Sequence, residues 1–149
     1  DMERVARALL AHAPRERRPK EALVFFGHGS PHAAQAVYPA LAYVLQKLDP
    51  HTSLGTVSGY PDLETVKQEL KSRGNQKAWL IPLMSVAGDH ARNDMAGREA
   101  DSWASQLGQA GVTCQPVMVG MAEHAEVVAV WMDHLQAAWD RLGKEQAHE

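Results

Sequence analysis

The segment Ala22-Leu-Val-Phe-Phe-Gly-His-Gly-Ser-Pro31 is a continuous apolar run that ends in a glycine-rich turn. An apolar run of this length, without alternating polar residues, is typical of a strand that is buried on both faces. Such strands occur in parallel sheets whose two faces are covered by helices. The segment therefore predicts an α/β domain, with the glycine-rich turn at the carboxyl end of a central strand.

Three further segments of strand length lie downstream of this run. They are residues 53–58, residues 78–84 and residues 112–119. Proline removes a hydrogen-bond donor from a sheet, so we expect Pro82 at a bulge or near the end of its strand.

Between the strand candidates, apolar residues recur at the three- and four-residue spacing of a helix face. The spacing predicts helices over residues 34–48, 63–70, 91–110 and 125–142, and a further helix opens the chain at residues 2–10. We expect Ser30 to cap the first of these and Pro31 to lie in its first turn. We expect the last helix to end at Gly143.

Strands that alternate with helices predict a three-layer, doubly wound parallel sheet, here of about four strands. We expect residues 1–20 to be a helix and basic linker that end a preceding half of the protein. Residues 21–143 are then the α/β domain, and residues 144–149 are a polar tail.

Composition excludes several classes of protein. The chain has 149 residues, enough for one domain, and its net charge of −3 offers no broad basic surface for nucleic acid or anionic membrane. A single cysteine excludes an internal disulfide framework and a cysteine-based zinc site. No apolar run is long enough to span a bilayer, and no signal peptide is visible. We expect a cytoplasmic location, with a periplasmic one open if a segment precedes the chain.

Candidate functional residues fall in the loops after the strands. Ligands of open parallel sheets bind beyond the carboxyl ends of the strands, where His28, His90 and the turn around Ser58 are expected to converge. Neutral imidazole binds cobalt, iron, nickel and zinc, and it also accepts a proton near neutral pH. The two histidines therefore predict an open site for a divalent metal. The alternative is that Gly27 and Gly29 only permit a tight turn, with His28 an ordinary loop residue.

The neighbours of these histidines are open to two interpretations each. Asp89 either caps a helix or orients the His90 ring, as carboxylates do for metal-bound imidazoles. Arg92 either meets acidic groups of a substrate or pairs with Asp94 or Glu99. A third glycine is needed for a dinucleotide-binding turn, and His32 stands in its place, so we expect no nucleotide and a surface or supporting role for His32.

The remaining histidines and three tryptophans have no obvious functional partners in the sequence. We expect solvated positions for the five remaining histidines, His12, His51, His124, His134 and His148. We expect core positions for the three tryptophans that lie in helical stretches, Trp103, Trp131 and Trp139.

Three motifs resemble those of the anaerobic sirohydrochlorin cobaltochelatases, the class II tetrapyrrole chelatases. They are Phe26-Gly-His-Gly-Ser30, Gly55-Thr-Val-Ser-Gly-Tyr-Pro61 and Ala87-Gly-Asp-His-Ala-Arg-Asn-Asp-Met-Ala-Gly97, the last being the most specific. The resemblance covers nearly the whole chain but only the C-terminal half of the usual two-half protein. It implies a partner half, supplied either by a homodimer or by an N-terminal segment.

The resemblance implies insertion of a divalent metal into sirohydrochlorin or a related tetrapyrrole, without a nucleotide. Cobalt is the expected metal, with iron and nickel as alternatives. By resemblance, His28 and His90 are the metal ligands and the bases that accept pyrrole protons. The residues implied to line the substrate site are Gly29, Ser30, Ser58, Gly59, Tyr60, Asp89 and Arg92.

The sequence departs from the family pattern at one position. Ser58 stands where the family has a glutamate that is implied to be the third metal ligand. A serine hydroxyl is an uncharged and poor ligand, so metal affinity or metal choice is expected to change. The alternative to an active chelatase is a non-catalytic module of the same fold that binds a metal or a tetrapyrrole.

Overall fold

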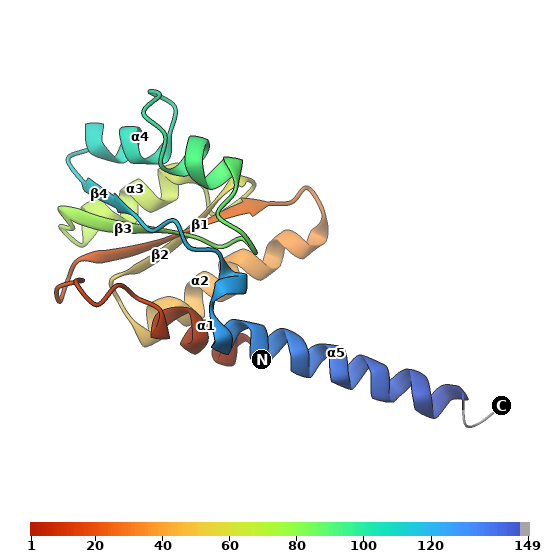
Figure 1. The fold of residues 1–149 in the computed structure, drawn as a ribbon. Coiled ribbons are helices and arrows are strands. Elements are labelled where there is room, and N and C mark those ends of the chain that lie inside the picture. The colour runs from red at the N-terminus through yellow and green to blue at the C-terminus, as the bar shows by residue number, and fades with distance from the viewer. Residues whose placement is uncertain (147–149) are drawn as a thin grey trace.

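The computed structural model describes residues 1–146 and contains a four-stranded, fully parallel sheet (Figure 1). The order of the strands across the sheet is β2-β1-β3-β4. Their bounds are Ala22–Gly29 for β1, Thr52–Ser58 for β2, Lys77–Pro82 for β3 and Thr113–Pro116 for β4. The predicted α/β class and the number of strands are confirmed, and Pro82 is the last residue of its strand as expected.

Helices cover both faces of the sheet. Because successive side chains of β1 point to opposite faces, Leu23 and Phe25 enter one core while Val24 and Phe26 enter the other. The first core is covered by helices of one layer: α1 (Met2–Ala11), α2 (Val37–Leu48) and the start of α5 (Ala125–Gln146). The second core is covered by α3 (Leu63–Ser72), α4 (Trp103–Gln109) and the short segment η2 (Ala91–Met95).

The predicted start of the helix after β1 is wrong. A short 3₁₀ turn, η1 (Ala33–Ala36), precedes α2, and its N-cap is His32, whose Nδ1 accepts the Ala34 amide at 3.1 Å. The Ser30 hydroxyl instead accepts the His32 amide at 3.1 Å, in a turn just outside the helix. The competing local hydrogen bond of the serine therefore moves the cap by two residues.

The predicted helix over residues 91–110 is also wrong, because the stretch divides in two. A π-helical turn, η2, ends at Met95, and α4 begins only at Trp103. Ser102 separates them: its hydroxyl accepts the Ser105 amide as the N-cap of α4 and donates to the Gly97 carbonyl at 2.7 Å. Trp103 is buried against Phe26, so its predicted core position is confirmed.

The core positions predicted for Trp131 and Trp139 are wrong. Both lie on α5, which extends away from the body of the domain, and Trp139 is 70% exposed. This helix also continues to Gln146, beyond the expected end at Gly143, because that glycine keeps a helical backbone there. Within residues 1–146, no helix has the length and apolarity that crossing a membrane requires.

The first helix is packed into the domain. Ala6 and Leu9 of α1 are buried in the core beside α2, and Arg4 forms an ion pair with Asp133 of α5 at 2.6 Å. The expectation that residues 1–20 end a preceding half stays a prediction.

The expected solvated positions are wrong for three of the isolated histidines, His12, His51 and His124, which are partly buried. His12, at the end of α1, stacks on His124 with ring centroids 3.8 Å apart and contacts the Glu126 carboxylate at 2.5 Å. His51 lies within 3.3 Å of the Asn75 amide. His134 is exposed and pairs with Asp1, and His148 lies outside the described residues. The sequence hid these contacts because their partners are distant along the chain.

The stacked histidines predict a loss of stability in acid. Burial, and then the neighbouring His12, lower the pKa of His124. The unfolded chain therefore binds the proton more readily than the folded one, so the stabilisation is complete above pH 6.5 and is lost as the pH falls through the lower, folded pKa. When the pH is lowered from 7.5 to 5.5, we expect the thermal unfolding temperature of the His124→Gln variant to fall by less than that of the parent chain. Equal losses would contradict this role of His124.

Candidate functional site

The carboxyl ends of β1 and β3 form the crevice of the sheet. The chain leaves β1 toward β2 on one side and returns to β3 on the other, so these two central strands flank the point where the strand order reverses. Loops diverge at such a point and leave room for a ligand. His28 is the penultimate residue of β1, and His90 directly precedes η2 in the loop after β3.

The two histidines lie against each other at this edge. Their ring centroids are 4.7 Å apart and their planes meet at 76°. His28 is exposed, and the side chain of His90 is 52% exposed, so a large ligand can reach both rings. The structure thus brings together two residues that are 62 positions apart in the sequence.

In both imidazoles, Nδ1 is engaged by an oxygen atom of a neighbouring residue. The Nδ1 of His28 is 3.1 Å from the Gly29 carbonyl oxygen, and the Nδ1 of His90 is 2.5 Å from Oδ2 of Asp94. Each oxygen is an acceptor, so each neutral ring donates through Nδ1 and keeps the lone pair of Nε2 free. Two Nε2 lone pairs at one edge are suited to bind a metal ion or to accept protons.

Asp94 is a functional candidate that the sequence analysis assigned only as a partner for Arg92. The carboxylate that orients His90 is Asp94, one turn further along the chain, and the orienting role proposed for Asp89 is wrong. Asp89 instead lies 4.0 Å from the Arg92 guanidinium, so the pairings of Arg92 with Asp94 or Glu99 are also wrong. The four-residue spacing of His90 and Asp94 was the available signal, since residues so spaced meet on a helical turn.

Gly29 sets the spacing between the loop after β1 and the loop after β2. It pairs with Ser58 across the sheet, has a φ of +85°, and a Cβ there would lie 1.7 Å from the Ser58 carbonyl oxygen. Only glycine fits this close approach at a positive φ. The exposed Ser58 is thereby held beside the residue that follows His28.

Gln35, which is not among the residues predicted from the sequence, ties the same two loops together. Its side-chain oxygen accepts the Ser30 amide at 2.7 Å, and its side-chain nitrogen donates to the Tyr60 carbonyl at 2.8 Å. A glutamine in a polar turn gives no sequence signal of this role. Through Gln35 of η1, the turn with Ser30 after β1 is therefore tied to the turn with Tyr60 after β2.

No carboxylate joins the two imidazoles as a third metal ligand in the described part of this edge. Within residues 1–146, no three His, Cys, Asp or Glu side chains gather closely enough to hold a metal ion. Ser58 supplies no carboxylate at the end of β2. Two imidazoles alone form an open, weak site, which suits a metal that is passed on.

Exposed apolar side chains surround the histidine edge. Tyr60 follows β2, Val86 follows β3 and Met118 follows β4, and they are 62%, 67% and 41% exposed. The loops after β3 and β4 are in close contact, since a Cβ on Gly120 would lie 2.6 Å from the Cα of Val86. Apolar groups on loops at one edge of a sheet are typical of a binding surface.

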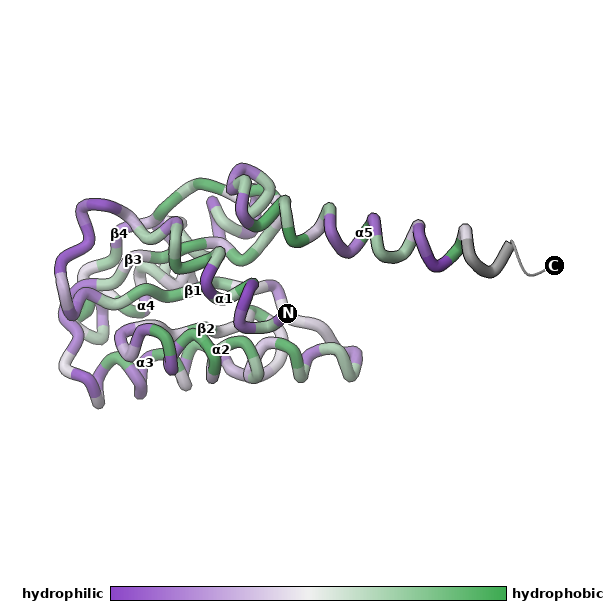
Figure 2. The backbone as a smooth tube through the Cα atoms, turned by 90° about the horizontal axis from the view of Figure 1, so that it is seen from below, coloured by the Kyte–Doolittle hydropathy of each residue, from purple (hydrophilic) through white to green (hydrophobic). Residues whose placement is uncertain are grey.

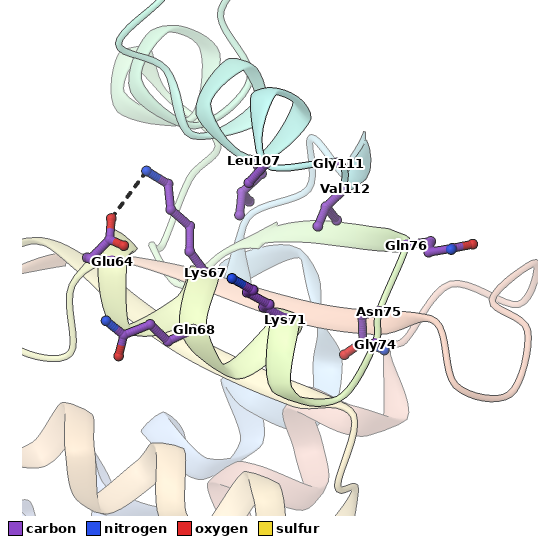
Figure 3. Close-up of a pocket in the computed structure, with 11 residues that line it drawn as sticks. Glu64, Lys67, Gln68, Lys71, Gly74, Asn75, Gln76, Leu107, Gly111 and Val112 are labelled. Atoms are coloured by element: carbon purple, nitrogen blue, oxygen red, sulfur yellow. Dashed lines mark hydrogen bonds and ion pairs between the residues drawn. The ribbon is translucent and has the colours of Figure 1, made fainter.

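A polar groove of about 590 Å³ lies elsewhere, at the amino ends of β3 and β4 (Figure 3). It runs between α3 and α4, and its lining includes Lys67, Lys71, Asn75 and Val112. The Nζ of Lys67 forms an ion pair with the carboxylate of Glu64 at 3.4 Å. No histidine or cysteine lines this groove, so the histidine edge is the better candidate for metal chemistry.

Known proteins of similar sequence were found over almost the whole chain. The sirohydrochlorin cobaltochelatase CbiKC of Nitratidesulfovibrio vulgaris is 49% identical over 142 residues, which are 95% of this chain and 50% of that protein. The sirohydrochlorin cobaltochelatase of Salmonella typhimurium is 35% identical over 130 residues, 87% of this chain and 49% of that protein. The chain thus spans about half the length of these relatives.

A solved structure supports the fold independently. A protein described as a cobalamin (vitamin B12) biosynthesis CbiX protein, from Marinobacter aquaeolei, superimposes with a TM-score of 0.65 at 19% identity. The match covers 83% of this chain and 98% of that one. The family model for cobalt chelatase (CbiK) matches residues 1–140. The resemblance stated from the three motifs is confirmed: the chain belongs to the cobalt chelatase (CbiK) family.

Proposed function

We propose that the edge formed by β1 and β3 inserts a divalent cobalt ion into sirohydrochlorin. The observation that carries this proposal is the pair of facing imidazoles, each with Nδ1 engaged by an oxygen and Nε2 free. The relatives that share half of their length with this chain are named for the same reaction, which supports the choice of metal and tetrapyrrole. Iron and nickel bind imidazole as well and are the alternative metals.

The proposed reaction exchanges one metal ion for two protons. The Nε2 atoms of His28 and His90 first bind Co²⁺ as it arrives from solution. When the metal moves onto the pyrrole nitrogens, each Nε2 lone pair becomes free and accepts one pyrrole N–H proton. Asp94 supports this step for His90, because a carboxylate at Nδ1 stabilises the positive charge that the ring acquires.

The apolar side chains at the edge are proposed to hold the macrocycle. A tetrapyrrole is flat and apolar at its centre, and Tyr60, Val86 and Met118 present exposed apolar surface on three separate loops. Sirohydrochlorin also carries many carboxylates at its rim. The exposed guanidinium of Arg92, one turn of chain after Asp89, is proposed to meet one of them.

An anaerobic spectrophotometric assay tests this proposal. The chain is mixed with sirohydrochlorin and Co²⁺, and the appearance of the cobalt-sirohydrochlorin spectrum is compared with the rate without protein. We expect a rate that rises in proportion to protein concentration. Folded protein that gives only the uncatalysed rate would overturn the proposal for the chain on its own.

A second candidate function follows from Ser58. Because the described part of the chain offers two imidazoles and no third ligand at this edge, the same geometry suits a non-catalytic module that binds a metal or a tetrapyrrole. Such a module would bind Co²⁺ or sirohydrochlorin at equilibrium without accelerating insertion. Binding measured by titration, together with an uncatalysed rate in the assay, would favour this candidate.

Ser58→Glu is predicted to strengthen metal binding. The change places a carboxylate at the end of β2, beside Gly29, and a charged third ligand next to two neutral imidazoles is worth about tenfold or more in affinity for a divalent ion. Isothermal titration with Co²⁺ measures the effect, and Ser58→Gln, which has the same size without the charge, is the matched control. Equal affinities for the two variants would place residue 58 outside the metal site.

A further inference from the structure

The turn after β1 is held by a side chain from the element that follows it. β1 is apolar up to Phe26, and the chain becomes polar where it leaves the sheet toward α2 (Figure 2). Gln35 lies in η1, between this turn and α2, and is half-buried. Its carboxamide has an acceptor oxygen and a donor nitrogen, so it can hold two backbone groups at once. The two groups that it holds belong to different loops of the site edge.

The acceptor side of Gln35 holds the peptide unit between Gly29 and Ser30. The Ser30 amide donates to Oε1 of Gln35 at 2.7 Å. The carbonyl of the same peptide unit, which belongs to Gly29, lies 3.1 Å from Nδ1 of His28. Because a peptide unit is planar, a hydrogen bond that holds its N–H also holds the direction of its carbonyl oxygen. Gln35 thus acts on the group that the His28 ring contacts.

The donor side of Gln35 holds the turn after β2. Its Nε2 donates to the Tyr60 carbonyl at 2.8 Å and lies 3.3 Å from Oγ1 of the buried Thr56. The Thr56 hydroxyl in turn donates to the Pro61 carbonyl at 3.0 Å. Two successive carbonyls of this turn, those of Tyr60 and Pro61, are therefore held by a connected pair of polar side chains.

The carboxamide of Gln35 also packs on the backbone of the turn after β2. Gly59 has a φ of +108°, and a Cβ there would lie 2.7 Å from both Cδ and Nε2 of Gln35. The orientation of the carboxamide is fixed by its partners, because the Ser30 amide can only donate and the Tyr60 carbonyl can only accept. Gln35 therefore has one arrangement that satisfies both loops.

The two rings at the site edge differ in the partner of Nδ1. For His90 the partner is the carboxylate of Asp94, and for His28 it is the neutral carbonyl of Gly29. A hydrogen bond to a charged acceptor is roughly twice as strong as one between neutral groups. Which nitrogen of a neutral imidazole carries the proton is set by the hydrogen bond that the ring makes. The tautomer of His28 therefore depends more on how well its weaker partner is held in place.

We propose that Gln35 is a positioning residue for His28. It acts through the peptide unit between Gly29 and Ser30, which keeps the proton of the neutral His28 ring on Nδ1 and the lone pair of Nε2 free. The same side chain couples this peptide unit to the turn with Tyr60, so the loops after β1 and β2 are set together. The inference rests on the proposed role of Nε2 of His28 in metal binding and adds the residue that prepares this atom.

Long-range ¹H–¹⁵N NMR of the metal-free chain tests this role without an insertion assay, because it reports which ring nitrogen carries the proton. In an alkaline buffer, we expect neutral His28 of the parent chain to carry its proton on Nδ1; the spectrum of His28→Asn assigns the signals. Gln35→Met keeps the length of the side chain but removes its hydrogen bonds, and it should lose at least half of the Nδ1–H form. Gln68→Met makes the same change at an exposed position of α3 and should leave the tautomer unchanged. Equal spectra of His28 in the two variants would overturn the proposal.

Gln35→Glu separates the two sides of the carboxamide. A carboxylate still accepts the Ser30 amide but has no donor for the Tyr60 carbonyl. We therefore expect Gln35→Glu to restore the Nδ1–H form of His28 that Gln35→Met loses. A variant that loses this form as fully as Gln35→Met would show that the hydrogen bond to Ser30 does not hold the ring.

Isothermal titration with Co²⁺ separates this inference from the proposed function. We expect Gln35→Met to bind Co²⁺ about tenfold more weakly than the parent chain, the lower end of the loss seen when a partner of a ligating histidine is removed. Circular dichroism checks that the fold is retained. A parent chain that binds no Co²⁺, with the tautomer of His28 still changed in Gln35→Met, would overturn the metal site and leave the positioning role standing. Equal Co²⁺ affinities and equal tautomers in the two chains would overturn the positioning role alone.

Discussion

His90→Ala is expected to reduce cobalt insertion at least 100-fold while the fold is retained. The substitution removes one of two Nε2 lone pairs, and with it both the proposed metal ligand and the proposed acceptor for one pyrrole proton. The side chain is 52% exposed and contacts His28 and Asp94, so its loss leaves no cavity in the core. The rate is measured in the anaerobic sirohydrochlorin assay, and circular dichroism checks the fold.

Two further variants make this prediction specific. His32→Asn replaces an exposed histidine four residues after His28 and keeps an N-cap side chain, so it should retain the parent rate. Asp94→Asn keeps the shape of the orienting residue but removes its charge, and losing such a partner costs about 10- to 100-fold. An unchanged rate in His90→Ala would show that the facing pair is not the insertion site.

Gly29→Ala is expected to destabilise the domain by at least about 3 kcal/mol. An alanine at a φ of +85° is strained, and its Cβ would lie 1.7 Å from the Ser58 carbonyl oxygen, which belongs to the neighbouring strand. The backbone of one strand end must move, and the loops with His28 and Ser58 move with it. Urea unfolding followed by circular dichroism measures the change in the free energy of unfolding.

Gly111→Ala is the matched control for this effect. Its φ of +87° is nearly the same, but a Cβ there would meet nothing within 4 Å. The control therefore isolates the backbone strain, which is about 1–2 kcal/mol, from the clash with the neighbouring strand. Equal losses of stability in the two variants would show that the close approach of Gly29 to Ser58 is relieved without cost.

The strands and the site edge could be predicted because their signals are local. The apolar run before Gly27 predicts a strand that is buried on both faces, and four segments of strand length joined by helices predict a parallel sheet. Parallel strands end at one edge, so the turns that hold His28 and His90 had to meet there. The motifs in these turns also predicted the family that the comparisons confirm.

Contacts between side chains at the site could not be predicted in the same way. Asp89 and Asp94 are both close to His90 in sequence, and only the turn of the backbone after His90 decides that Asp94 is the one that touches the ring. Gln35 reaches Ser30 and Tyr60 because η1 precedes α2, a turn that depends on a competing serine hydrogen bond. The four-residue spacing of His90 and Asp94 is compatible with a contact on a helical turn, but in both cases the backbone placement decides which side chains meet.

The sequence by itself determined the α/β class, the edge at which His28 and His90 meet and the apolar stripe of the last helix, because hydrophobic periodicity and strand ends are properties of consecutive residues. Only the tertiary structure decided that His28 and His90 face each other with Nε2 free, and that Trp139 lies in solvent. An apolar stripe looks the same in sequence whether its own domain or a partner covers it. What separates the two cases is the direction in which α5 leaves the body, and that direction is fixed by contacts with α1, far away along the chain.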